Sequence, residues 1–122
     1  MKIKLASINL EVAAPERSKR FYLDVLGMVE DARRSHPPDF VYLSSEGCDI
    51  TLARPQSVSG GEPSGTMELG FEVDDINAMK AHLAALGLVE FREESMGWGN
   101  ALELKDPDGH RVLIYAFKTG GP

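Results

Sequence analysis

Few side chains in this sequence are of the kind that perform covalent chemistry. Cys48 is the single cysteine. It alternates with Ile50 and has no adjacent histidine to activate its thiol, so we expect a small core residue rather than a nucleophile. His36 precedes two prolines, His82 lies beside an apolar helical stripe, and His110 follows a turn. We expect all three histidines at ordinary surface positions without a chemical role.

Polar, charged and aromatic residues alternate with apolar ones along several strand-like segments. Since successive strand residues point to opposite faces of a sheet, one residue in two of each segment shares a face. The residues expected on this common face are Ser7, Asn9, Glu11, Asp49, Thr51, Ala53, Glu68, Gly70, Glu72, Arg111, Leu113, Tyr115 and Phe117. Acids mixed with aromatic rings suit a partly cationic, partly flat organic molecule. An alternative remains open, in which Glu11 and Glu72 are solvated strand ends.

Trp98 is the only tryptophan, and glycines stand on both sides of it. A lone tryptophan is commonly a core residue, but these glycines predict a loop at the rim of the sheet. Trp98 is therefore a candidate ligand contact, with burial in the core as the alternative.

The elements that must position these residues occur twice along the chain. Val12 and Val73 are 61 residues apart, and Gly27 and Gly87 are 60 residues apart. Each half places a short strand before an amphipathic helix that ends at one of these glycines, and three more strand-like segments follow. We predict two β-α-β-β-β modules that form curved mixed sheets around a concave cleft, an α+β fold with its helices on the outer face.

Local signals give the approximate bounds of these elements. Pro15 suits the first turn of the first helix, and Asp74 or Asp75 can cap the second. The apolar helix stripes are Phe21, Tyr22, Val25 and Leu26, and Ile76, Met79, Leu83 and Leu86. The later strands are expected near 28–33, 39–44, 48–54, 88–93, 100–105 and 110–117. We expect one domain over 1–122, with module 1 at 1–56, a Gly/Ser-rich linker at 57–65 and module 2 at 66–118.

Composition excludes several classes of partner. The formal net charge is -6, and the basic residues are not clustered, so nucleic acid is not an expected partner. The sequence contains no apolar run long enough to span a bilayer and no signal-like segment after Met1, so we expect no membrane partner and a cytoplasmic location.

Several linked motifs resemble the glyoxalase, bleomycin-resistance and extradiol-dioxygenase superfamily, also called vicinal oxygen chelate proteins. The segment 18–27, SKRFYLDVLG, is similar to the superfamily's S-x-x-FY-x-x-xLG signature, and 71–75, FEVDD, resembles its FxVxD strand end. Trp98-Gly99-Asn100 followed by 106–110, DPDGH, resembles its WG and DPDGN ending. The resemblance covers essentially the whole chain and is specific at the superfamily level.

The resemblance implies a concave site for a small molecule, commonly beside a divalent metal held by His and Glu. Carried over by position, the four metal-ligand positions fall on Ser7, Thr51, Glu68 and Leu113. This set contains one carboxylate, two hydroxyls and an aliphatic side chain, whereas a bound transition metal usually needs three or more His, carboxylate or thiolate ligands. We therefore expect no metal and no other cofactor.

The leading hypothesis is a metal-free protein that binds or sequesters a small aromatic or partly cationic compound, as the bleomycin-resistance members do in antibiotic resistance. Its expected ligand-binding residues are Ser7, Asn9, Thr51, Glu68, Trp98, Leu113 and Tyr115. The first alternative is a divalent-metal-dependent lyase, isomerase or dioxygenase with an altered site. Glu68 would be the general base of an enzyme if neighbours such as Leu113 raised its pKa. A second alternative is a member whose cleft is only structural or an interaction surface. We also expect a homodimer, because the resemblance implies paired modules and the long linker permits modules to pair between chains.

Overall fold

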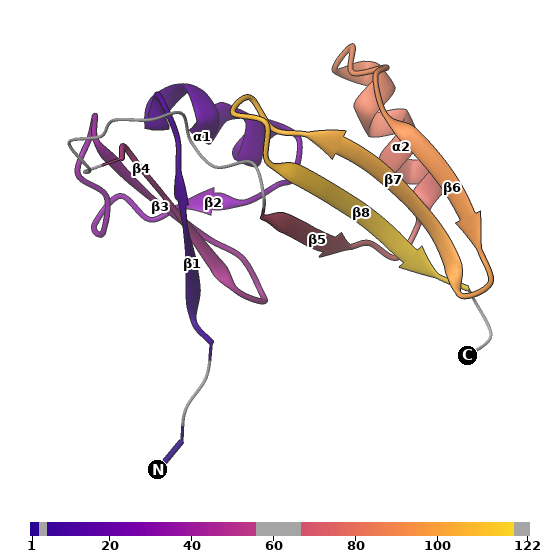
Figure 1. The fold of residues 1–122 in the computed structure, drawn as a ribbon, viewed down its shortest axis with the longest axis horizontal. Helices are drawn as coiled ribbons and strands as arrows, with labels where there is room; N and C mark the ends of the chain where they lie inside the picture. Colours follow the sequence, from indigo (N-terminus) through magenta and orange to yellow (C-terminus); the bar gives the residue numbers. More distant parts are fainter. Residues whose placement is uncertain (3–4, 56–66, 119–122) are drawn as a thin grey trace. The chain divides into compact units, whose positions relative to one another are not determined.

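A computed structural model describes residues 1–2, 5–55 and 67–118. The chain divides into two compact units, residues 1–64 (unit 1) and 65–122 (unit 2). Each unit contributes one helix and four strands to the described residues, which confirms the predicted β-α-β-β-β repeat (Figure 1). The linker predicted at 57–65 lies outside the described residues, and the module bounds remain predictions.

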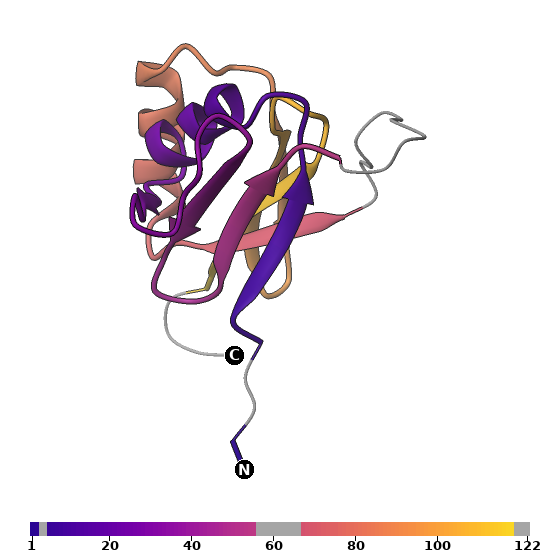
Figure 2. The same cartoon turned by 90° about the vertical axis from the view of Figure 1, so that its left-hand side faces the viewer.

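Unit 1 is one mixed sheet with one helix. Its strands have the order β1-β4-β3-β2, with β1 parallel to β4 and the other pairs antiparallel (Figure 2). The elements are β1 (Ser7–Glu11), α1 (Pro15–Asp24), β2 (Val29–Glu30), β3 (Phe40–Ser44) and β4 (Asp49–Ala53).

Unit 2 repeats this topology. Its sheet has the order β5-β8-β7-β6, again with the first pair parallel and the others antiparallel. The elements are β5 (Glu68–Glu72), α2 (Ile76–Ala85), β6 (Arg92–Met96), β7 (Gly99–Lys105) and β8 (Arg111–Phe117). Because both sheets have the same strand order, corresponding residues of the two halves occupy corresponding sheet positions.

The helices begin and end where local chemistry predicts. Pro15 is the first residue of α1, and the carboxylate of Asp75 caps α2 by accepting hydrogen bonds from the N–H groups of Asn77 and Ala78 at 3.0 and 3.1 Å. Gly27 and Gly87 follow the helices with φ values of +69° and +75°. Such left-handed residues end helices without the steric cost that a Cβ adds. None of the helices in the described ranges is long and apolar enough to span a membrane.

Each sheet has a buried face and an open face. In unit 1, α1 packs against β3 and β4, with Tyr22 buried, and Leu10 and Leu52 lie in the same core. In unit 2, Leu83 of α2 is buried, and the sheet residues Leu102 and Ile114 are fully inaccessible. We call the side opposite these buried residues the open face of each unit.

Three details of the fold differ from the sequence-based expectations. The strand predicted near 28–33 is only two residues long, Val29–Glu30. The bounds predicted for the strand near 88–93 are wrong, because β6 spans Arg92–Met96. A two-residue turn at Gly97–Trp98 pairs Met96 with Gly99, and this turn sets the register in which β6 pairs with β7. The apolar stripe of α2 also ends early, since Leu86 at the helix end is 43% exposed. These differences depend on pairing and packing that local periodicity does not specify.

Candidate functional site

The open face of unit 1 carries the first three predicted site residues. Asn9 on β1 lies opposite Thr51 on β4, and Ser7 lies opposite Asp49. The hydroxyl of Thr51 donates a hydrogen bond to Asn9 Oδ1 at 2.7 Å, and Thr51 is buried. Ser7 is exposed. The hydroxyl of Thr51 and the side-chain carbonyl of Asn9 are therefore already engaged with each other within the sheet.

A second polar network crosses the same face from the segment that follows β2. Arg34 Nη1 donates to the hydroxyl oxygen of Tyr42 at 3.0 Å, and this hydroxyl donates to Asp49 Oδ2 at 2.8 Å. The hydrogen bond to Asp49 is the main cause that raises the pKa of Tyr42 above its ordinary value of 10.0; desolvation adds to it, and Arg34 partly offsets it. The Tyr42 phenol thus stays neutral, and the network ties the segment after β2 to the sheet.

The open face of unit 2 has a different character at the corresponding positions. Gly70 occupies the place on β5 that Asn9 occupies on β1, and its neighbours Leu113 and Tyr115 lie on β8. A Cβ added to Gly70 would meet Cε1 of Tyr115 at 3.4 Å, so the tyrosine ring lies beside the bare backbone of β5. Where unit 1 presents a hydrogen-bonded polar pair, unit 2 presents an apolar and aromatic surface.

Three rings form what we call the aromatic cluster: Trp98, Tyr115 and Phe117. The ring centroids of Trp98 and Tyr115 are 6.0 Å apart, those of Trp98 and Phe117 5.7 Å, and those of Tyr115 and Phe117 5.5 Å, all in edge-on arrangements. These spacings are typical of favourable aromatic pairs. Trp98 remains 41% exposed and Phe117 58% exposed. The cluster is therefore internally packed and still offers ring surface to a ligand.

Gly99 brings Trp98 onto this face. Gly99 lies opposite Phe117, and a Cβ at Gly99 would lie 2.1 Å from the carbonyl oxygen of Ala116. The backbone N–H of Lys118 also donates to the carbonyl of Trp98 at 2.9 Å. The hairpin tip can approach β8 this closely because residue 99 has no side chain.

The four positions implied by the superfamily do not form a suitable metal donor set. In unit 1, Thr51 uses its hydroxyl to bond Asn9, and Ser7 offers a neutral hydroxyl. In unit 2, Leu113 has no donor atom, which leaves Glu68 as the only carboxylate. Neutral hydroxyls and an aliphatic chain do not replace the histidines and carboxylates that transition metals require. Throughout the described residues, no group of three or more His, Cys, Asp or Glu side chains is placed to hold a metal ion.

His110 corrects one expectation, because it is buried rather than on the surface. Its Nδ1 lies 2.8 Å from Asp106 Oδ2, and Asp106 Oδ1 accepts hydrogen bonds from the backbone N–H groups of Asp108 and His110 at 2.9 and 2.8 Å. The pair closes the turn between β7 and β8, where Gly109 has φ +89°. The turn between β7 and β8 thus has a structural role, and the His110 side chain is buried within it. His36 and His82 are exposed as expected.

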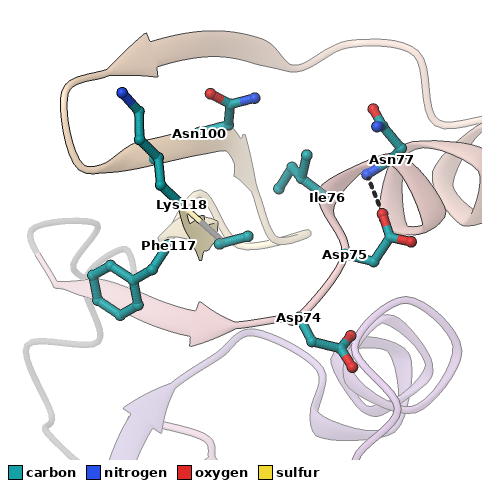
Figure 3. Close-up of a pocket in the computed structure, with 9 residues that line it drawn as sticks. Asp74, Asp75, Ile76, Asn77, Asn100, Phe117 and Lys118 are labelled. Atoms are coloured by element: carbon teal, nitrogen blue, oxygen red, sulfur yellow. Dashed lines mark hydrogen bonds between the residues drawn. The ribbon is translucent and has the colours of Figure 1, made fainter. Parts of the chain in front are cut away.

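A pocket of about 430 Å³ lies at the start of α2 (Figure 3). Its lining residues are Asp74, Asp75, Ile76, Asn77, Gly99, Asn100, Ala116, Phe117 and Lys118. None of the seven predicted ligand-binding residues is among them. The carboxylate of Asp75 is occupied in capping α2, so it satisfies the helix N–H groups that would otherwise attract an anion.

The structure brings the predicted residues together in two sets. Ser7, Asn9 and Thr51 share the open face of unit 1. Glu68, Leu113, Tyr115 and Trp98 belong to the open face of unit 2. Sequence reasoning placed Phe117 on this face but did not select it as a ligand contact. The alternation along β8 carried that signal, because Phe117 stands two residues after Tyr115.

Comparison with known proteins gives a family and a fold. The family model of the Glyoxalase/Bleomycin resistance protein/Dioxygenase superfamily matches residues 4–114 of the sequence. One curated relative, a histidinol-phosphate aminotransferase from Vibrio campbellii, is 38% identical over 58 residues, which are 47% of this chain. The matched segment spans only 17% of the aminotransferase, so its activity is not transferred to this chain.

Solved structures share the complete fold. A lactoylglutathione lyase from Agrobacterium tumefaciens aligns with a TM-score of 0.74 and 17% identity, over 94% of each chain. A glyoxalase/bleomycin resistance protein/dioxygenase from Nocardioides aligns with a TM-score of 0.75 and 22% identity, over 99% of this chain and 87% of that chain. An antibiotic-binding protein from a Streptomyces species aligns with a TM-score of 0.72 and 22% identity, over 97% and 99% of the two chains. At these identities the likeness shows the fold alone.

Proposed function

The chain belongs to the Glyoxalase/Bleomycin resistance protein/Dioxygenase superfamily, and from this premise we propose that it binds and sequesters a flat aromatic small molecule without a metal ion. The proposed contacts are those expected from the sequence, Ser7, Asn9, Thr51, Glu68, Trp98, Leu113 and Tyr115, together with Phe117. An antibiotic-binding protein of the same fold provides a precedent for this kind of function.

The observation that carries the proposal is the aromatic cluster on the open face of unit 2. Its centroid separations of 5.5 to 6.0 Å leave no space between the rings, so a ligand would lie against their exposed surfaces. Trp98 and Phe117 keep 41% and 58% of their surface accessible, although burying such rings is strongly favourable. A flat apolar molecule that covers them would recover this free energy.

The chemistry of the implied metal positions supports a binding role over a metal-dependent reaction. Lewis-acid catalysis needs an ion held by several strong donors with one coordination position open to substrate. Of Ser7, Thr51, Glu68 and Leu113, only Glu68 is such a donor. The lyase, isomerase or dioxygenase alternative would require ligands from outside this set.

The test is a binding measurement with a defined flat aromatic probe, 1-naphthylmethylamine, by isothermal titration calorimetry. We expect saturable binding to the parent protein and a loss of affinity of about tenfold or more in Trp98→Ala, because one aromatic contact contributes about 1 to 3 kcal/mol. Val89→Ala removes apolar surface from an exposed residue of unit 2 outside the cluster and serves as the matched control. Equal affinity of the parent and Trp98→Ala would contradict the proposal.

We also propose that the protein is a homodimer, since paired modules recur in this superfamily and a Gly/Ser-rich linker permits pairing between chains. Sedimentation equilibrium at micromolar concentration tests this directly. A monomer at every concentration would contradict the dimer and leave the binding proposal unaffected.

A further inference from the structure

The carboxylates on the open face of unit 2 differ in what lies beside them. Glu68 at the start of β5 pairs in register with Arg111 on β8, so its nearest cross-strand neighbour carries the opposite charge. Glu72 at the end of β5 pairs with Tyr115, a member of the aromatic cluster. Neighbouring strands lie about 4.8 Å apart, so side chains in register on the same face are adjacent. Glu72 is therefore the carboxylate residue directly opposite a member of the aromatic cluster.

The charges around the aromatic cluster favour a cation. On the same face, Arg92 of β6 lies between two carboxylates, with Nη2 2.9 Å from Glu94 and 3.6 Å from Glu103. Glu72 is exposed, and among the described residues it forms no ion pair. Lys118 lines the pocket at the start of α2 together with Asn100 and Ala116 (Figure 3). Glu94 and Glu103 thus both lie near Arg92, whereas Glu72 has no ion-pair partner among the described residues and is the carboxylate available to a ligand cation.

From this arrangement we infer that Glu72, rather than Glu68, is the specificity-determining charged residue of the site, and that the ligand is an aromatic amine in its cationic form. The aromatic part lies against Trp98, Tyr115 and Phe117, and the ammonium group lies between the Glu72 carboxylate and the Tyr115 ring. Both groups attract a cation, one by its charge and the other through its π-face. This inference rests on the proposed function and adds the charge of the ligand.

The spacing limits the class of amine. Glu72 and Tyr115 are direct cross-strand neighbours, so a nitrogen that contacts the carboxylate lies close to the aromatic cluster. An ammonium group one or two bonds from a flat ring system meets this condition. An amine on a long flexible chain would pay additional conformational entropy to place its nitrogen there.

Three naphthalene probes of similar size separate charge from shape: 1-naphthylmethylamine as the cation, 1-naphthalenemethanol as its close neutral analogue and 1-naphthoate as the anion. Titration calorimetry at low ionic strength should show the cation binding the parent about two- to fivefold more tightly than the alcohol, with the anion weakest, as expected for a solvent-exposed ion pair. Glu72→Gln should remove most of the preference for the cation and leave only the part due to the Tyr115 ring, and affinity for the alcohol should not change.

Two further variants make the test specific. Glu90→Gln removes one negative charge from an exposed residue of unit 2 outside the strands and should keep the preference for the cation. A cation preference that is unchanged in Glu72→Gln, or one that Glu68→Gln removes instead, would overturn the inference. If the parent binds cation and alcohol equally and Trp98→Ala weakens both, the proposed function stands and only the inference fails. If no probe binds the parent, both fail.

Discussion

Replacing Gly99 by alanine tests how the hairpin tip is held on β8. The new Cβ would lie 2.1 Å from the carbonyl oxygen of Ala116 and 3.0 Å from Cα of Phe117, whereas real Cβ contacts essentially never fall below 3.0 Å. The neighbouring atoms are backbone, so rotation of a side chain cannot relieve the clash. The start of β7 must move from β8 by about an ångström.

The cost follows from what that movement disrupts. Overpacking of this kind costs about 1 to 3 kcal/mol, and loss of a backbone hydrogen bond at the end of the β7–β8 ladder adds about 1 kcal/mol. We therefore expect Gly99→Ala to lower the free energy of unfolding by about 2 to 4 kcal/mol. For a chain of this length, this corresponds to a decrease in Tm of roughly 10 °C.

The assay is thermal unfolding followed by circular dichroism and by the fluorescence of Trp98, the only tryptophan. The matched control is Gly97→Ala in the same turn, because a Cβ at Gly97 meets nothing within 4 Å and the residue does not have positive φ. We expect the control to change stability by less than about 0.5 kcal/mol. Equal stability of the two variants would refute the reasoning about close approach.

Three other variants or measurements address the remaining features. Asp106→Ala leaves His110 and two backbone N–H groups without their acceptor in a buried turn, so we expect a loss of about 2 to 4 kcal/mol in chemical denaturation, and a loss below 1 kcal/mol would contradict the structural role of the pair. The raised pKa of Tyr42 means that its hydrogen bond to Asp49 is fully formed below pH 10 and is lost as the pH rises through the folded-state value. The parent should therefore lose its stability advantage over Tyr42→Phe on alkaline titration, and an advantage that grows with pH would oppose this sign. Protein purified without added ions should contain no stoichiometric transition metal by mass spectrometry, and a metal that Glu68→Ala removes would favour the enzyme alternative.

Local sequence signals predicted most of the fold because they act over a few residues. Helix bounds are an example: Pro15 and the Asp75 cap specify where the two helices begin, and the glycines after both helices specify where they end, each through its own backbone or side-chain chemistry. The repeat then predicted two identical strand orders, since equal patterns at a constant offset bury equal faces. Alternation likewise predicted the open faces, including Ser7 and Glu68 as exposed and Leu69 as buried.

The tertiary structure decided which of these residues are neighbours. Only strand register places Glu72 beside Tyr115 and Glu68 beside Arg111, and only the close approach at Gly99 brings Trp98 onto the rings of β8. The burial of His110 depends on a carboxylate four residues away that turns back toward it. Periodicity along the chain states which face a side chain points to, but hydrogen bonding between distant strands determines what stands opposite it.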